Sequence, residues 1–129
     1  MNLVTADMRR STTTPNATMT TLASPTLGGA HASVWLVEMP GGATGPVHAF
    51  AGELVWAITR GTARLTTGDP ARPVEEIDLR AGDTVVLPGG ELRRFAAGPD
   101  GFSAVVAGAA PGEVTRAGGE PAGVPAWVA

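Results

Sequence analysis

Short apolar runs separated by glycine and proline constrain the fold of this chain more than any other feature of its sequence. The chain has 18 glycines and 11 prolines among 129 residues. From Ser33 onward, no apolar run keeps a helical periodicity over the ~11 residues of an average helix. Strand-length runs between turn residues are typical of an antiparallel sandwich or barrel. The sequence therefore predicts an all-β fold.

The same pattern places individual strands and turns. Arg60-Gly61 separates two runs and is interpreted as a tight hairpin, and 98–101 is interpreted as a loop between two further runs. A first strand is expected directly after Met19. The other expected strands are Ser33–Met39, Glu53–Thr59, Thr62–Thr67, Val74–Leu79, a run beginning at Thr84, another around Phe95, and Phe102–Gly108.

Two spaced motifs make the prediction more specific. In the first, Gly42 and Gly61 flank His48, and in the second, Gly82 precedes Pro88 and Gly90. The two motifs resemble the paired motifs of the cupin superfamily over about residues 42–97. This resemblance implies a single-domain jelly-roll β-barrel. It also implies a homodimer, because members of the superfamily commonly pair.

The metal-ligand positions of the two motifs have been replaced. His48 keeps one of them, but Phe50, Leu54 and Arg93 stand at the other three. Glu53 lies one residue before its expected position, so on a strand it should point to the opposite face unless Gly52 forms a bulge. One imidazole is not the three-ligand set common in catalytic metal sites. We therefore expect no metal and no other cofactor.

The resemblance also indicates where a ligand would bind. The family's cavity lies inside the barrel, and residues two apart on a strand share a face. Phe50, Leu54 and Trp56 share parity with His48. The expected ligand-binding residues are His48, Phe50, Leu54, Trp56, Arg93 and Phe95.

His48 and Arg93 each allow two interpretations. His48 either moves a proton, since imidazole titrates near neutral pH, or only bonds a nearby backbone group. Arg93 either clamps a ligand anion or pairs with Glu53 or Glu91. We favour the ion pair, because an unpaired buried arginine is costly. If His48 and Arg93 converge, the pKa of His48 should fall below its usual ~6.5.

The ends of the chain differ in composition from its middle. Residues 1–18 are rich in Ser, Thr and Pro and are predicted to be a flexible extension, followed by the barrel at 19–108. Residues 109–129 form a Gly/Pro-rich tail. Because a free chain gains nothing from exposing a large ring, Trp127 is expected to dock this tail.

Composition excludes several functions. The chain has nine arginines, no lysine and twelve acidic residues, so nucleic acid is not an expected partner. No apolar run approaches the ~20 residues of a membrane span. The absence of cysteine fits a cytoplasmic protein.

We predict a metal-independent cupin-fold protein that binds a small organic molecule, including anionic ones, inside the barrel. The alternative is a metal-free isomerase or cyclase with His48 as acid and base. The chain has no tyrosine, the partner that metal-free cupin epimerases typically add to the histidine. A structural homodimer module without a ligand is a second alternative.

Overall fold

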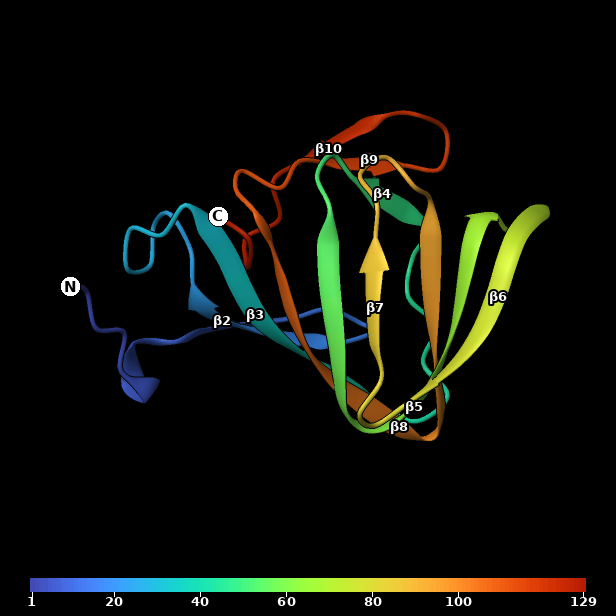
Figure 1. Ribbon diagram of the computed structural model, residues 1–129, viewed down its shortest axis with the longest axis horizontal. Coiled ribbons are helices and arrows are strands. Elements are labelled where there is room, and N and C mark those ends of the chain that lie inside the picture. The colour runs from blue at the N-terminus through green and yellow to red at the C-terminus, as the bar shows by residue number, and fades with distance from the viewer.

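A computed structural model describes all 129 residues, and nearly every element in it is an antiparallel strand (Figure 1). The all-β prediction is confirmed. The one helix has three residues, and no helix is long and apolar enough to span a bilayer. The elements are η1 (Ala6–Met8), β1 (Arg10–Thr13), β2 (Thr18–Ala23), β3 (Ala32–Met39), β4 (His48–Phe50), β5 (Leu54–Asp69), β6 (Arg72–Arg80), β7 (Thr84–Leu87), β8 (Arg93–Ala109), β9 (Val114–Arg116) and β10 (Pro121–Gly123).

Two long strands, β5 and β8, connect two layers of the barrel. The first half of β5 and the second half of β8 pair with each other, and they lie between β7 and β3. The other halves also pair with each other and lie between β6 and β4. The strand order in one layer is therefore β1-β2-β3-β8-β5-β7, and in the other it is β10-β9-β4-β8-β5-β6.

Glycines mark the places where the long strands pass between the layers. The β5–β8 register shifts on either side of Gly61, and Gly61 and Gly101 both have positive φ (74° and 75°). A Cβ atom on Gly61 would lie 2.0 Å from the Gly101 carbonyl oxygen. The predicted hairpin at Arg60-Gly61 and the predicted loop at 98–101 are therefore wrong. Here glycine permits a bend and a close backbone approach within a continuous strand.

The core lies between the two layers. Buried and partly exposed residues alternate along β3 and along the first half of β5, as expected for strands with one inner face. Trp35, Phe102 and Val106 are almost completely buried. Burying such a side chain contributes on the order of 1.5–3 kcal/mol, so the core between the layers supplies most of the stability of the barrel.

The structure differs from the expected flexible extension over residues 10–18. β1 pairs in register with β2, and the Arg10 guanidinium donates hydrogen bonds to Ser24 Oγ at 3.0 Å and Thr26 Oγ1 at 2.9 Å. The strand is rich in Thr, which favours extended backbone. It has no apolar alternation because no residue of β1 is fully buried.

The C-terminal segment closes one end of the barrel (Figure 1). β9 pairs with β4, and β10 returns along β9. Val128 is buried against Gly112, and Ser33 donates a hydrogen bond to the Val128 carbonyl. Trp127 is partly buried and packs against the core. This segment therefore forms part of the wall around the barrel interior.

Candidate functional site

A cavity of about 780 Å³ lies inside the barrel at the end covered by the C-terminal segment. More than half of its lining residues are hydrophobic. Five of the six residues predicted to bind a ligand lie on it, and these are His48, Phe50, Trp56, Arg93 and Phe95.

Leu54 does not line this cavity. It shares the inner face of β5 with Trp56, as its parity predicted, but it is 3% exposed and lies in the core. It pairs with Leu87 and with Gly108, and a Cβ on Gly108 would lie 2.4 Å from Leu54 Cδ2. Alternation along a strand predicts which face a side chain lies on. Whether an inward side chain lines the cavity or packs in the core depends on its neighbours on other strands.

Aromatic rings form much of the wall. The rings of Trp56 and Phe95 stack at 4.2 Å between centroids, and those of Trp35 and Phe50 lie 6.2 Å apart. Stacked rings hold one another in fixed positions and present flat apolar surfaces. The cavity therefore suits an apolar, planar body.

Arg93 is the one charged side chain buried in this wall. The residue is 2% exposed, and its Nη1 donates a hydrogen bond of 2.8 Å to the His48 carbonyl oxygen. The guanidinium carbon lies 4.8 Å from the centre of the Phe50 ring. Nε and Nη2 are buried without a hydrogen-bond partner. Burial lowers the pKa of Arg93 to about 10, so the side chain is charged at neutral pH.

The predicted ion pair of Arg93 with Glu53 or Glu91 is wrong. Glu53 is exposed and does not line the cavity. Glu91 raises the pKa of Arg93 through its charge but lies beyond ion-pair distance. Arg93 lines the cavity, whereas neither glutamate does.

His48 lies beside Arg93 on the adjacent strand and is half-buried. Its Nδ1 lies 2.9 Å from the Pro46 carbonyl oxygen. A carbonyl can only accept, so the neutral ring carries its proton on Nδ1 and has a lone pair on Nε2. Burial, and secondarily the charge of Arg93, lowers the pKa of His48 to about 4. The predicted fall is confirmed in direction, although burial is its larger cause.

The side chains do not fit a metal ion of the kind that cupin motifs usually hold. No group of three His, Cys, Asp or Glu residues lies close enough to share an ion. Phe50 offers no donor atom, and the Arg93 guanidinium beside His48 would repel a cation.

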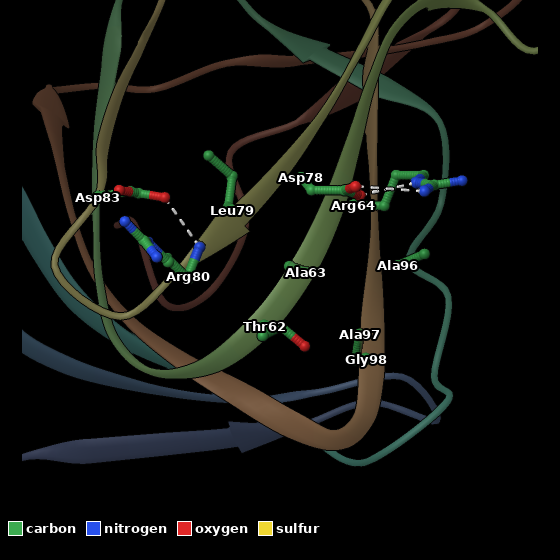
Figure 2. Close-up of a pocket in the computed structure, with 10 residues that line it drawn as sticks. All are labelled: Thr62, Ala63, Arg64, Asp78, Leu79, Arg80, Asp83, Ala96, Ala97 and Gly98. Atoms are coloured by element: carbon green, nitrogen blue, oxygen red, sulfur yellow. Dashed lines mark hydrogen bonds and ion pairs between the residues drawn. The ribbon is translucent and has the colours of Figure 1, made fainter.

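A second hollow of about 500 Å³ is lined by residues of β5, β6 and β8 (Figure 2), and it shares no lining residue with the first cavity. Three of its four charged residues take part in hydrogen bonds through their side chains, and the fourth, Arg80, is exposed. Asp83 accepts a 2.9 Å hydrogen bond from the Arg80 backbone, and Arg64 bonds Asp78. This hollow therefore offers no buried, unsatisfied polar group to a ligand.

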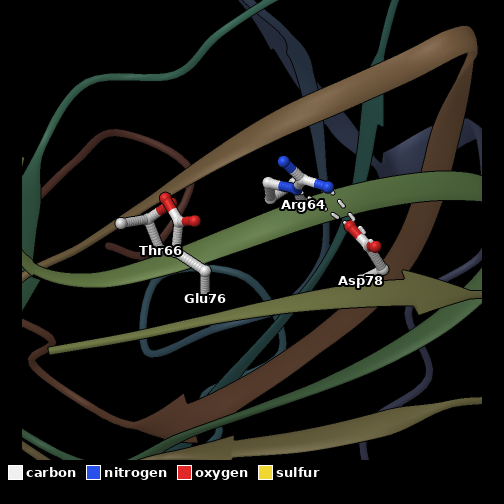
Figure 3. Close-up of polar contacts among 4 residues, drawn as sticks. All are labelled: Arg64, Thr66, Glu76 and Asp78. Carbon is white, nitrogen blue, oxygen red and sulfur yellow. Dashed lines mark hydrogen bonds and ion pairs between the residues drawn. The ribbon is translucent and has the colours of Figure 1, made fainter. Parts of the chain in front are cut away.

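The Arg64–Asp78 pair joins the outer faces of β5 and β6 (Figure 3). Arg64 Nε lies 2.9 Å and Nη2 lies 3.4 Å from the two carboxylate oxygens. Next to this pair, Thr66 donates a 3.4 Å hydrogen bond to Glu76. Both members of the ion pair are largely exposed.

Sequence reasoning missed the part of the cavity wall that the two ends of the chain supply. Arg116 and Glu120 from the tail line the cavity, as do Asn16 and Ala17 before β2. The three-residue strand β9 is too short for alternation to be recognised. The one signal was Trp127, which also lines the cavity.

No protein-family model and no curated protein matches this chain. Solved structures do match. An oxalate decarboxylase variant from Bacillus subtilis superposes with a TM-score of 0.71 at 15% identity, covering 80% of this chain and 28% of that chain. The formate complex of oxalate decarboxylase from Lactobacillus farciminis gives 0.71 at 18% identity, with 81% and 31% covered. The coconut allergen cocosin gives 0.71 at 22% identity, with 81% and 30% covered.

These similarities confirm the cupin jelly-roll fold that the two motifs predicted. This chain matches less than a third of the length of each of the three structures. At these identities the likeness describes the fold, and the site must be interpreted from its own residues.

Proposed function

We propose that this protein binds a small amphipathic organic anion inside the barrel, without a metal. The observation that carries the proposal is Arg93, a buried cation in an apolar cavity with no carboxylate partner in the chain. A buried charge is stable only when it is paired and hydrogen-bonded. A carboxylate or phosphate on a ligand would supply both the charge and the acceptors that Nε and Nη2 lack.

The remaining groups of the site would recognise the rest of such a ligand. The Trp56 and Phe95 rings would contact its apolar body, and Nε2 of His48 would accept a hydrogen bond from a ligand hydroxyl or amine. Nε and Nη2 of Arg93 are shielded from water in this structure. The anionic group would therefore reach them with a small shift of neighbouring side chains.

The alternative of a metal-free isomerase or cyclase has less support. A histidine with a pKa of about 4 is a weak base at neutral pH. No tyrosine is present to act as its acid partner. Binding therefore remains the better-supported function, and the expected homodimer stays a prediction that light scattering in solution would test.

Mass spectrometry of small molecules extracted from the purified protein tests the proposal. We expect an anionic molecule with an apolar body from the wild-type protein and from Arg94→Gln, which removes a cation at the next position of β8 outside the cavity. Arg93→Gln should lose it. Equal recovery from both variants would contradict a role for Arg93.

A further inference from the structure

Four polar residues lie in one row across the layer of the barrel that contains β4 and β9. The strand register pairs Thr67 of β5 with Arg93 of β8, Arg93 with His48 of β4, and His48 with Arg116 of β9. Directly paired residues on neighbouring strands have adjacent side chains. The row therefore places a histidine between two arginines, in a wall that is otherwise mostly apolar.

The two arginines differ in depth. Arg93 is 2% exposed, and the Thr67 hydroxyl beside it is also buried without a partner. Arg116 is exposed and lies in the C-terminal segment, yet it lines the same cavity. The row thus runs from the deep wall of the cavity to its rim.

The cation at the rim has no carboxylate partner. Glu120 also lines the cavity, and its carbonyl accepts a 2.9 Å hydrogen bond from the Arg116 backbone. The carboxylate of Glu120 nevertheless lies beyond ion-pair distance, since the chain contains one salt bridge, Arg64–Asp78. Both cations on this cavity are therefore available to anionic groups of a ligand.

The neutral histidine between them keeps the two cations separate. His48 adds no third positive charge, and with its proton on Nδ1 it offers an acceptor to the cavity. Two strand spacings of about 4.8 Å separate the backbone of Arg93 from that of Arg116, or roughly 10 Å in total. The two side chains therefore start from positions two strands apart, one in the deep wall and one at the rim, so each can take its own anionic group.

Building on the proposed function, we propose that the ligand is a dianion, with one anionic group at Arg93, an apolar body on the aromatic wall and a second anionic group at Arg116. Arg93 supplies binding at the buried end. Arg116 supplies the selectivity for two charges over one.

Two rigid probes test this inference. Biphenyl-4-carboxylate and biphenyl-4,4'-dicarboxylate share the same apolar body, and the second places its carboxylates roughly 10 Å apart, about the spacing of the backbone positions of the two arginines across two strands. Isothermal titration calorimetry of each probe gives the preference of the protein for the dianion. We expect the wild-type protein to prefer the dicarboxylate roughly tenfold, as a charge-assisted hydrogen bond at the rim would give.

Three variants separate the roles of the arginines. Arg116→Gln should abolish the preference while keeping monocarboxylate affinity, and Arg93→Gln should weaken both probes at least tenfold. Arg94→Gln should behave as wild type, although it carries the same loss of charge. If Arg93→Gln does not fold, Arg93→Lys, which keeps the charge but loses the guanidinium fork, takes its place and should weaken both probes.

The possible failures are distinguishable. Equal wild-type affinity for the two probes, or a preference that survives Arg116→Gln, would overturn the dianion inference and leave anion binding at Arg93 intact. If Arg93→Gln left the affinity for both probes unchanged, or if the wild-type protein bound neither probe, the proposed function would be overturned and the dianion inference with it.

Discussion

The layer that contains β4 and β6 carries one arginine on its outer face and one on its inner face, and the two differ in burial and in partners. On the outer face, Arg64 is largely exposed and bonds both carboxylate oxygens of Asp78. On the inner face, Arg93 is buried with no carboxylate within ion-pair distance. The pKa of Arg64 is raised by its hydrogen bond to Asp78, whereas burial lowers that of Arg93 to about 10.

This difference shows where the fold leaves a charge unsatisfied. Water alone would solvate Arg64, so its ion pair contributes little to stability. Arg93 would gain far more from a partner, yet the chain supplies only a carbonyl oxygen and an aromatic ring. A side chain kept in a costly state by the fold indicates a function, and here that function would be recognition of an anion.

The largest expected effect is a gain in stability when the buried charge is removed. Arg93→Met should raise the free energy of unfolding by about 2 kcal/mol, because relief of the desolvation outweighs the lost hydrogen bond and ring contact. Urea denaturation at neutral pH measures this change. Arg64→Met is the matched variant on the outer face and should move the midpoint much less. A loss of stability in Arg93→Met would show that Arg93 is structural.

The next effect is a dependence of stability on pH that originates at His48. Its folded pKa of about 4 lies below the usual 6.5, so the unfolded chain binds the proton more tightly. The contribution to stability is therefore full above about pH 6.5 and is lost as the pH falls through 4. We expect a loss of about 1.5 kcal/mol between these limits, reduced from the full linkage value because the ring is half-exposed. His48→Asn should flatten this part of the stability curve, and identical curves would contradict it.

A smaller effect is expected on the pKa of His48 when Arg93 is replaced. The charge of Arg93 contributes to the low pKa of His48, so Arg93→Met should raise that pKa. The pKa should stay below 6.5, because burial is the larger cause. NMR titration of the His48 ring resonances measures the shift, with Arg64→Met as the control. An unmoved titration would mean that the two side chains do not interact.

The smallest effect is expected for the outer pair itself. Asp78→Asn should leave the melting temperature almost unchanged, and high salt should remove the remaining difference. Calorimetric melting at low and high salt tests this. A large drop would show that the outer pair supports the β5–β6 hairpin, and the contrast between the two faces would then be smaller than described.

Much of the site could be predicted because strand parity is a local property. The alternation around His48 placed Phe50 and Trp56 on its face, and the second motif placed Arg93 and Phe95. The pairing of Arg93 could not be predicted, since it depends on where distant carboxylates lie. Arg116 was missed because β9 is held by pairing with β4, a contact about 66 residues away along the chain.

The prediction of strand boundaries was limited in the same way, because they too depend on distant contacts. The jelly roll could be predicted from two spaced motifs, but strand ends inferred from glycine were wrong at Gly61 and Gly101. In a sequence, a glycine that ends a strand looks the same as one that bends it. Similarly, β1 has no apolar pattern to detect because none of its residues is fully buried.

The passage of β5 and β8 through both layers also has a kinetic consequence. β8 is the common neighbour of β3, β4 and β5, which lie tens of residues earlier in the chain. Local hairpins such as β5–β6 can form early, but neither layer is complete without its own half of β8. Chains dominated by such distant pairings fold slowly, typically in milliseconds to seconds. A growing chain would keep its aromatic inner face exposed until β8 had been synthesised, and the end of the barrel would stay open until the C-terminal segment followed.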